Sequence, residues 1–386
     1  MPKQLFIDIS ELVTKDAKSG IQRVVRSILL QLLKTPPPGY RVEPVYSQRG
    51  NGLLYARRFV AKFTAGQLET LDDSPVRFSD GDIFLGLDLA AHLFPAINPT
   101  LYKMQAGGVQ IYYVVYDMTP LRNPQWHVPE MSKVFASWLY SLSRYADGLI
   151  CISSAVADDV RQYLVESEYK VPRLSYFHLG ADVGNSVPTK GLPDTADAVL
   201  SRLTESPSFL MVGTLEPRKG HAQVLAAFDD LWASGVDVNL VIVGKIGWHV
   251  ETLLAQLQSH PEAGRRLLGL DSISDEYLEK VYQASTVLIA ASEAEGFGLP
   301  LVEAARHKLR IIARDIPVFR EVAGEHAFYF NSTTSEGLAQ SLRTWLALDS
   351  KGGAPKVDGM HWLSWAQSAE QLLRNVIPTE SQLQET

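Results

Sequence analysis

The chain alternates short runs of β-branched and aromatic residues with longer segments in which apolar residues recur every three to four positions. Such alternation predicts βα units arranged around parallel sheets, and it occurs twice, once in each half of the chain. In the first half, the apolar face of a predicted helix runs through residues 21–32. The strands predicted in the first half are 5–9, 83–85, 110–116, 148–152 and 174–178. Those predicted in the second half are 208–212, 239–243, 266–270, 286–290, 310–313 and 327–330.

The length of 386 residues is sufficient for two domains, each with its own core. A stretch rich in Gly, Pro and turn-forming residues at 184–194 is the expected linker between them. A second break, at 351–355, precedes a final helix expected from about Trp362 to Val376. We therefore predict three parts: an N-terminal domain, a C-terminal domain, and a terminal helix that packs back on the N-terminal domain. Their ranges are 1–185, 186–358 and 359–386.

The composition, with 46% hydrophobic and 20% charged residues, is that of an ordinary globular protein. The single cysteine, Cys151, excludes an intramolecular disulfide and a cluster of thiolate metal ligands. The first residues lead directly to Asp8, and no run approaches about 18 apolar residues. We therefore expect no signal peptide, no membrane span and a cytoplasmic location.

The net charge of −7 divides into +1 for residues 1–185 and −8 for the remainder. An acidic chain of this kind is a poor candidate for binding nucleic acid, which needs clustered Lys and Arg. In the first half, Arg57, Arg58 and Lys62 interleave with aromatic residues. This pattern fits either a solvated helix face or peripheral contact with anionic lipid headgroups at the inner face of the cytoplasmic membrane.

The most informative segment is 295–304, which follows a predicted strand and opens a helix. Its glycines, including Gly298, permit close backbone approach, and Pro300 suits the first helical turn, so backbone N–H groups and the helix dipole form an anion pocket. We expect Glu303 in the opening turn, where a carboxylate can bond vicinal hydroxyls such as those of a ribose. Glu295 would be repelled by a diphosphate and is better placed against a sugar. The local pattern also fits an ordinary strand-to-helix turn with two surface glutamates.

Two carboxylates separated by seven residues, in the form E-G-F-G-L-P-L-V-E-A, resemble the E-x7-E motif of retaining nucleotide-sugar glycosyltransferases of the GT-B type, family 4. Segments 212–220, 241–245 and 274–278 resemble the donor domain of that family, and 19–22 and 146–153 match its first domain. The resemblance spans nearly the whole chain. It implies two Rossmann-like α/β/α domains that face each other across a cleft, with the donor at the carboxyl ends of the second-domain strands.

The resemblance also implies roles for particular residues. Glu295 would contact the donor sugar, Lys219 the diphosphate leaving group, and Glu303 the ribose. A further donor contact is expected from Gly20, at the turn between the first strand and the first helix, which would approach the diphosphate from the first domain. The other expected donor contacts are Gly213, Thr214, Gly244, Lys245, Phe297, Gly298 and Leu299.

Two positions depart from the family pattern. Thr214 replaces a common arginine, while Arg218 stands immediately before Lys219, so either Arg218 reaches the diphosphate or one cation is missing. We expect the first, because leaving-group charge in a water-poor site demands compensation. The family's His-Asp or His-Glu pair corresponds here to Tyr116 and Asp117. Asp117 is expected to stabilise the transferred sugar, with Tyr116 beside the acceptor.

Gln22 and Arg23, which open the first helix, are two further expected acceptor contacts. The resemblance is strongest to bacterial enzymes that build O-antigens, often from GDP-mannose, and it implies transfer to a glycan or lipid-linked glycan without a metal cofactor. A non-hydrolysing nucleotide-sugar 2-epimerase of the same architecture and a catalytically silent binding module remain as alternatives. Asp80-Gly81-Asp82 formally matches a metal-binding D-x-D motif, but Asp-Gly before a strand is also a common turn.

Overall fold

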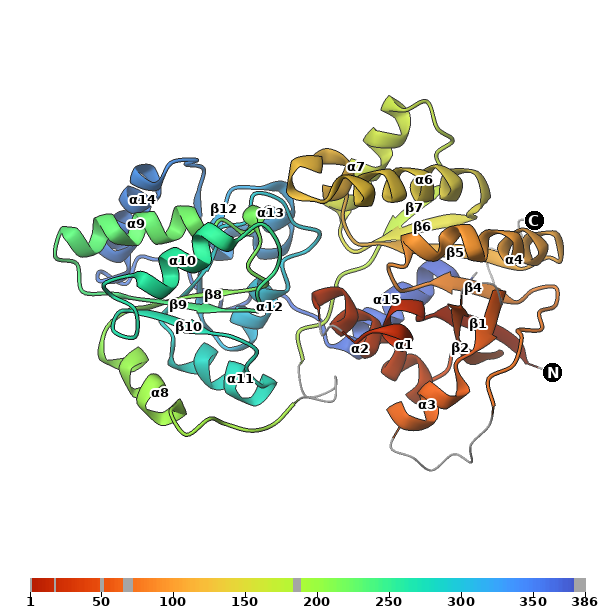
Figure 1. The fold of residues 1–386 in the computed structure, drawn as a ribbon, viewed down its shortest axis with the longest axis horizontal. Helices are drawn as coiled ribbons and strands as arrows, with labels where there is room; N and C mark the ends of the chain where they lie inside the picture. Colours follow the sequence, from red (N-terminus) through yellow and green to blue (C-terminus); the bar gives the residue numbers. More distant parts are fainter. Residues whose placement is uncertain (1, 17–18, 49–51, 65–71, 183–188, 378–386) are drawn as a thin grey trace. The chain divides into compact units, whose positions relative to one another are not determined.

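The computed structural model describes residues 2–16, 19–48, 52–64, 72–182 and 189–377, and it contains two compact α/β units (Figure 1). The first unit comprises the described residues up to Gly180 together with those from Leu363 onward, and the second unit comprises the described part of 181–362. The predicted boundary between 185 and 186 lies outside the described residues. The second boundary falls between 362 and 363 rather than 358 and 359, directly before the last helix.

The first unit contains a seven-stranded sheet in the order β3-β2-β1-β4-β5-β6-β7. All neighbouring strands are parallel except β2 and β3, which are antiparallel. The central strands are apolar on both faces, as expected when helices cover both sides of a sheet. The strands are β1 (Lys3–Asp8), β2 (Tyr40–Gln48), β3 (Gly52–Tyr55), β4 (Ile83–Gly86), β5 (Gln110–Val115), β6 (Gly148–Cys151) and β7 (Arg173–Tyr176).

Helices cover both faces of this sheet (Figure 1). One face packs against α4, α6 and α7, whose apolar residues share a core with Phe84, Tyr113 and Leu149 of the strands. On the other face, α2 packs against the last helix, α15. The helices are α1 (Ser10–Thr14), α2 (Gly20–Lys34), α3 (Arg57–Phe63), α4 (Phe94–Ala106), α5 (Thr119–Arg122), α6 (Pro129–Tyr145), α7 (Ser154–Glu166) and α15 (Trp365–Val376).

Three elements of the first unit were not predicted from the sequence. The β2 strand contains Pro44, which cannot donate a ladder hydrogen bond and therefore argues against a strand. The β3 strand has only four residues. The α1 helix stands between the first strand and α2, so Gly20 is the first residue of α2 and not part of a direct strand-to-helix turn.

The second unit is a six-stranded sheet in the order β10-β9-β8-β11-β12-β13, in which all neighbouring strands are parallel. The bounds of β8 and β9 coincide with those predicted. The strands are β8 (Ser208–Val212), β9 (Asn239–Val243), β10 (Leu267–Leu270), β11 (Val287–Ala290), β12 (Arg310–Arg314) and β13 (Phe328–Phe330).

Two groups of helices cover this second sheet (Figure 1). The α9 and α14 helices pack together on one face, where Phe209, Phe228 and Trp345 form an edge-to-face aromatic cluster. The α8 and α11 helices pack together on the other. The helices are α8 (Ala196–Glu205), α9 (His221–Ala233), α10 (Glu251–Ser259), α11 (Asp275–Ala284), α12 (Leu299–Arg306), α13 (Pro317–Ala323) and α14 (Ser335–Asp349).

The predicted return of the last helix to the first unit is confirmed. The α15 helix begins with a capping box in which the Ser364 hydroxyl accepts a hydrogen bond from the Gln367 amide and the Gln367 side chain accepts one from the Ser364 amide. The Ser368 hydroxyl donates to the carbonyl of His178 at 2.7 Å. A Cβ atom at Gly180 would lie 2.6 Å from the backbone nitrogen of Trp365, so only glycine permits this contact.

Candidate active site

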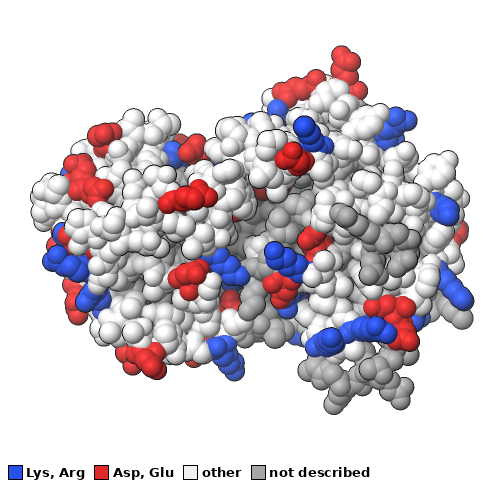
Figure 2. All heavy atoms as spheres, viewed as in Figure 1, with Lys and Arg blue, Asp and Glu red and all other residues white. Residues whose placement is uncertain are grey.

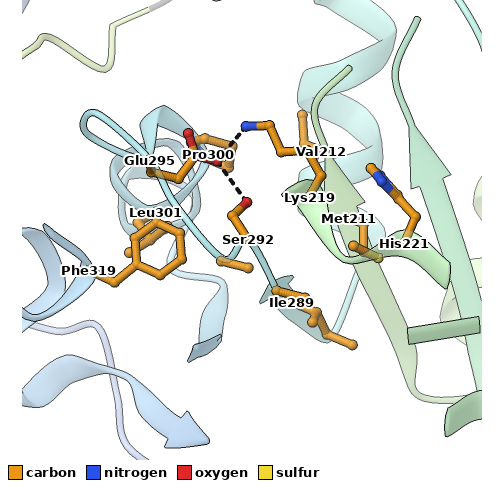
Figure 3. A pocket seen from close by; sticks show the side chains of 12 residues that line it. Met211, Val212, Lys219, His221, Ile289, Ser292, Glu295, Pro300, Leu301 and Phe319 are labelled. Carbon is orange, nitrogen blue, oxygen red and sulfur yellow. Dashed lines mark hydrogen bonds and ion pairs between the residues drawn. The ribbon is translucent and has the colours of Figure 1, made fainter. Parts of the chain in front are cut away.

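The candidate site of the second unit lies at the carboxyl ends of β8 and β11, which are neighbours in the sheet. The loop after β8 forms a short 3-10 turn, Pro217–Lys219, and the loop after β11 carries Ser292 and Glu295. Ligands of open α/β sheets bind at this edge, because the loops that leave parallel strands meet there. Figure 3 shows side chains from both loops directed toward one another.

Glu295 is the residue on which these contacts converge. Its Oε1 atom accepts hydrogen bonds from the ammonium group of Lys219 and from the Ser292 hydroxyl, the latter at 2.7 Å (Figure 3). Its Oε2 atom accepts a hydrogen bond of 3.1 Å from Nη1 of Arg218. The side chain of Glu295 is only 12% exposed, so the surrounding solvent weakens these interactions little.

The ionisation of Glu295 follows from these neighbours. Burial by itself would raise its pKa, but the charges of Lys219 and Arg218, together with the hydrogen bonds from Lys219 and Ser292, outweigh burial and lower the pKa to about 2. The carboxylate is therefore charged at neutral pH.

A second carboxylate, Glu216, lies beside the first. Its Oε2 atom accepts a hydrogen bond of 2.8 Å from Nε of Arg218, and the residue is 6% exposed. Burial raises the pKa of Glu216, against the opposing effect of the neighbouring cations Arg218 and Lys219. Arg218 thus lies between two carboxylates.

The helix after Glu295 begins in the way that an anion pocket requires. Gly298 is the N-cap of α12 with a φ angle of +93°, and a Cβ atom there would lie 2.7 Å from the ring of Phe319. Pro300 is the second residue of the helix. The Leu301 amide already donates to the Gly298 carbonyl at 2.9 Å and Pro300 has no N–H group, so the positive end of the helix dipole is what this terminus offers to an anionic ligand.

Glu303 lies deeper than predicted. It is the fifth residue of α12, not part of the first turn, and it is 5% exposed. Its Oε2 atom accepts a hydrogen bond of 2.7 Å from the hydroxyl of Tyr282 on α11. The expectation of a glutamate in the opening turn failed because the helix starts at Leu299 and residues 295–298 form the loop.

The other predicted donor contacts surround this cluster. Gly213 and Gly244 follow β8 and β9, and they touch each other so closely that a Cβ atom on Gly244 would lie 1.8 Å from the Gly213 carbonyl oxygen. Thr214 and Lys245 are half-buried next to them.

The predicted donor residues of the loop after β11 present themselves differently. The side chain of Phe297 is buried, at 4% exposed, whereas Leu299 at the start of α12 is half-buried. The ring of Phe297 therefore packs in the protein interior and does not face a ligand.

In the first unit, Asp117 lies just past the carboxyl end of β5. Its Oδ1 atom accepts hydrogen bonds from the amide and the hydroxyl of Thr119, at 3.0 and 2.7 Å. Nε2 of the buried His127 lies 3.2 Å from the same hydroxyl. Tyr116 is 3% exposed and donates to the carbonyl of Leu87 at 2.7 Å, so the expectation that it contacts an acceptor is not supported by its position in the core.

The remaining predicted residues of the first unit lie at the start of α2. Gly20 is exposed, and a Cβ atom there would meet no atom within 4 Å. Arg23 is half-buried. Gln22 is 5% exposed, and its side-chain amide donates a hydrogen bond to the carbonyl of Lys15. Gln22 therefore stabilises the chain before the helix and does not face a sugar acceptor.

Asp82 has a structural role. Its Oδ1 atom accepts a hydrogen bond of 2.7 Å from the amide of Gln4, and its Oδ2 atom accepts one of 2.9 Å from the amide of Ser79. Gly81 has a φ angle of +79°. These contacts favour the turn over the metal-binding interpretation of Asp80-Gly81-Asp82. Within the described residues, no group of three or more His, Cys, Asp or Glu side chains is arranged to hold a metal ion.

Three residues of the site were missed at the level of sequence. Glu216 and Ser292 contact Arg218 and Glu295, as described above. His221, the first residue of α9, lines the same pocket and is 2% exposed. Burial, followed by the charge of Lys219, lowers the pKa of His221 to about 4, so its imidazole is neutral. The available signals were weak: Ser292 lies two residues past the strand predicted to end at 290, and Glu216 lies within the segment 212–220, with His221 directly after it.

The chain thus has two α/β units built on mainly parallel sheets, and the second carries a charged cluster at the carboxyl ends of its strands. This arrangement defines a protein of the GT-B fold with two Rossmann-like domains. Solved structures share this fold. Sucrose-phosphate synthase from Thermosynechococcus elongatus aligns over 97% of this chain and 98% of its own, with a TM-score of 0.63 and 16% identity. Anabaena HepE in complex with UDP-glucose aligns over 99% and 97%, with a TM-score of 0.62 and 16% identity.

Residues 194–353, which lie within the second unit, match the family model described as glycosyl transferases group 1. Among curated relatives, the serotype-specific mannosyltransferase WbdA of Escherichia coli is 47% identical over 97% of this chain. The alignment covers 45% of WbdA, so the chain spans about half the length of that relative. The O-antigen chain mannosyltransferase RfbU of Salmonella typhimurium is 26% identical over 59% of each chain.

Proposed function

We propose that the chain is a retaining glycosyltransferase that moves mannose from GDP-mannose to a glycan or lipid-linked glycan acceptor in O-antigen synthesis. The observation that carries the proposal is the 47% identity to mannosyltransferases over nearly the whole chain. The geometry supports it, since Lys219 and the N-terminus of α12 offer positive charge to a diphosphate while Glu295 offers a carboxylate to a sugar. Neither glutamate need act as nucleophile. The departing diphosphate oxygen takes the proton of the acceptor hydroxyl on the same face of the sugar.

The test combines donor binding with product analysis. Thermal melts with GDP-, UDP- and dTDP-sugars identify the donor, because a ligand at 100 times its dissociation constant stabilises by about 2.7 kcal/mol. The preferred donor is then incubated with oligomannose acceptors, and the anomeric configuration of the product is read by NMR. We expect an α-linked mannoside from GDP-mannose. An epimerised sugar formed without acceptor would identify the epimerase, and binding without turnover of any acceptor would identify a silent module.

We propose that turnover needs no divalent metal, because protein cations and a helix terminus supply the charge that a metal supplies elsewhere. The expected result is an unchanged kcat when the enzyme is assayed in excess EDTA after dialysis against the chelator. The control is the same assay with added Mg²⁺ or Mn²⁺. A complete loss of turnover that these ions restore would contradict the proposal.

Glu303 is proposed to contact the ribose of the donor. Such a contact changes little as the glycosidic bond breaks, so Glu303→Ala is expected to raise the donor KM more than it lowers kcat. Steady-state kinetics measure this split. Because Tyr282 donates a hydrogen bond to Glu303, the Tyr282→Phe variant, which loses that hydrogen bond, serves as a control for local structural change. A fall in kcat at unchanged KM would contradict the ribose contact.

Peripheral contact with the membrane is proposed through α3. None of the helices that the structure describes between residues 2 and 377 has the length and apolar character needed to cross a bilayer. Arg58 and Lys62 are exposed on α3, and the guanidinium group of Arg57 lies 4.8 Å from the ring centre of Tyr55. Arg58 also pairs with Asp72, and Figure 2 shows acidic and basic side chains interspersed over the visible face, so the attraction to lipid is modest.

Charge reversal tests this surface. Arg57→Glu, Arg58→Glu and Lys62→Glu together are expected to lower binding to anionic liposomes severalfold, and added salt is expected to lower wild-type binding, because exposed charges are screened within ~10 Å at 0.1 M. Co-sedimentation measures both effects. The matched control reverses three exposed lysines of the second unit: Lys308, Lys351 and Lys356. Equal binding of the α3 variant and wild type would show that α3 is only a solvated surface.

A further inference from the structure

Arg218 is enclosed by acceptors that belong to the protein itself. Its Nε atom donates to Glu216 at 2.8 Å, and its Nη1 atom donates to Glu295 at 3.1 Å and to the carbonyl of Ala294 at 3.0 Å. Its side chain is 14% exposed. Its backbone is tied to the same loop, because the carbonyl of Arg218 accepts a hydrogen bond of 2.8 Å from the amide of Glu293.

We propose that Arg218 is a positioning residue, held by Glu216, that fixes the carboxylate of Glu295 toward the donor sugar and leaves the diphosphate charge to Lys219. This inference rests on the proposed function and deepens it. It revises the expectation that Arg218 replaces the cation missing at Thr214, and it gives Glu216 a role.

The chemistry of the two cations supports this division. A guanidinium group is planar and rigid, so it fixes the orientation of the carboxylates that it bridges, whereas an ammonium group on a flexible stem can turn toward a new partner. Lys219 pairs with Glu295 through a single ammonium group. When a diphosphate enters, Lys219 can turn to it while Arg218 keeps Glu295 in place.

The charges of the cluster lead to the same conclusion. Glu216 and Glu295 are balanced by Arg218 and Lys219 before any ligand binds. If Arg218 turned to the diphosphate, Glu216 would lose its ion pair while 6% exposed. Breaking a buried ion pair is strongly destabilising, because the remaining charge is uncompensated.

The experiment compares Arg218→Lys and Glu216→Gln with wild type. Both variants are expected to lower kcat by about 10²-fold through misplacement of Glu295, while the Kd for GDP, measured by calorimetry, stays within about twofold. The matched control is Arg266→Lys, which alters a two-bond Arg266–Glu262 pair in the loop before β10, outside the residues that line the pocket. That control is expected to keep the wild-type kcat. Thermal melts confirm folding, and Glu216→Gln keeps the test available if Arg218→Lys unfolds.

A pH profile separates positioning from a general loss of structure. Glu295 faces Arg218, Lys219 and Ser292, with Glu216 on the far side of Arg218. The Arg218→Met variant lacks one of the positive charges that keep Glu295 ionised, so the pKa of Glu295 is expected to rise. The fall of kcat at acidic pH is then expected to begin at a higher pH than in the wild type. A merely structural defect would lower kcat without changing the pH at which that fall begins.

Two results would overturn the inference. One is a rise of tenfold or more in the Kd for GDP in Arg218→Lys with no effect in Glu216→Gln, which would make Arg218 a diphosphate ligand. The other is an unchanged kcat in both variants. If the proposed function is wrong, the wild-type protein transfers no sugar, and this is seen before any variant is made. That result would remove the basis of the inference as well, and it differs from both results above.

Discussion

Replacing Lys219 by alanine is expected to lower kcat by on the order of 10²–10³, because its ammonium group stabilises the charge that grows on the departing diphosphate. Lys219 lies on the 3-10 turn after β8, 15% exposed, and its hydrogen bond to Glu295 keeps it at the pocket. An interaction that strengthens toward the transition state affects kcat more than ground-state binding. Steady-state kinetics with saturating donor measure the effect.

The control for this variant is Lys351→Ala, which removes an exposed lysine of the second unit. It is expected to leave kcat unchanged. Loss of Lys219 also leaves Glu295 with one cation fewer, so thermal melts are needed to separate catalysis from folding. A Lys219→Ala enzyme with wild-type kcat and a raised donor KM would show that Lys219 contributes only to ground-state binding.

Replacing Glu295 by glutamine is expected to lower kcat by about 10²-fold or more, while the Kd for free GDP changes little. Glu295 is expected to contact the sugar, whose charge changes during transfer, whereas free GDP carries no sugar. Steady-state kinetics and calorimetry supply the two numbers. Glu262→Gln is the matched control, since Glu262 also pairs with an arginine, Arg266, but lies outside the pocket residues. Loss of GDP binding in Glu295→Gln would mean that the donor lies along this loop in the opposite direction.

The pKa of Glu295 also sets an expected pH dependence. Burial raises this pKa, but Lys219 and Arg218 outweigh burial and lower it to about 2. Because the folded pKa is depressed, the stabilisation by these ion pairs is fully present above about pH 4.3 and is lost as the pH falls toward 2. The wild-type kcat is therefore expected to show no acidic limb from Glu295 between about pH 5 and 8. A limb in that range that disappears in Glu295→Gln would contradict the assignment.

Much of the fold could be predicted from local pattern. The bounds of β8 and β9 were predicted correctly, because parallel strands covered on both faces appear in the sequence as uninterrupted apolar runs. The β2 strand was missed, because Pro44 interrupts the residue pattern that predicts a strand. The strand forms nevertheless, because its pairing with β1 and β3 stabilises it. Glu295 and Lys219 were identified from a family motif, and the structure places them in direct contact.

The sequence by itself determined which residue types stand at the ends of which strands, because hydrophobic period and turn chemistry are local properties. Only the tertiary structure decided which of those ends meet. Arg218 and Glu295 are 77 residues apart, and they touch because β8 pairs with β11 and not with β10. Strand order depends on how helices pack over a whole sheet, which no spacing records. For the same reason, the sequence could not show that Glu216, Tyr116 and Glu303 are buried, because their burial depends on which elements pack against them.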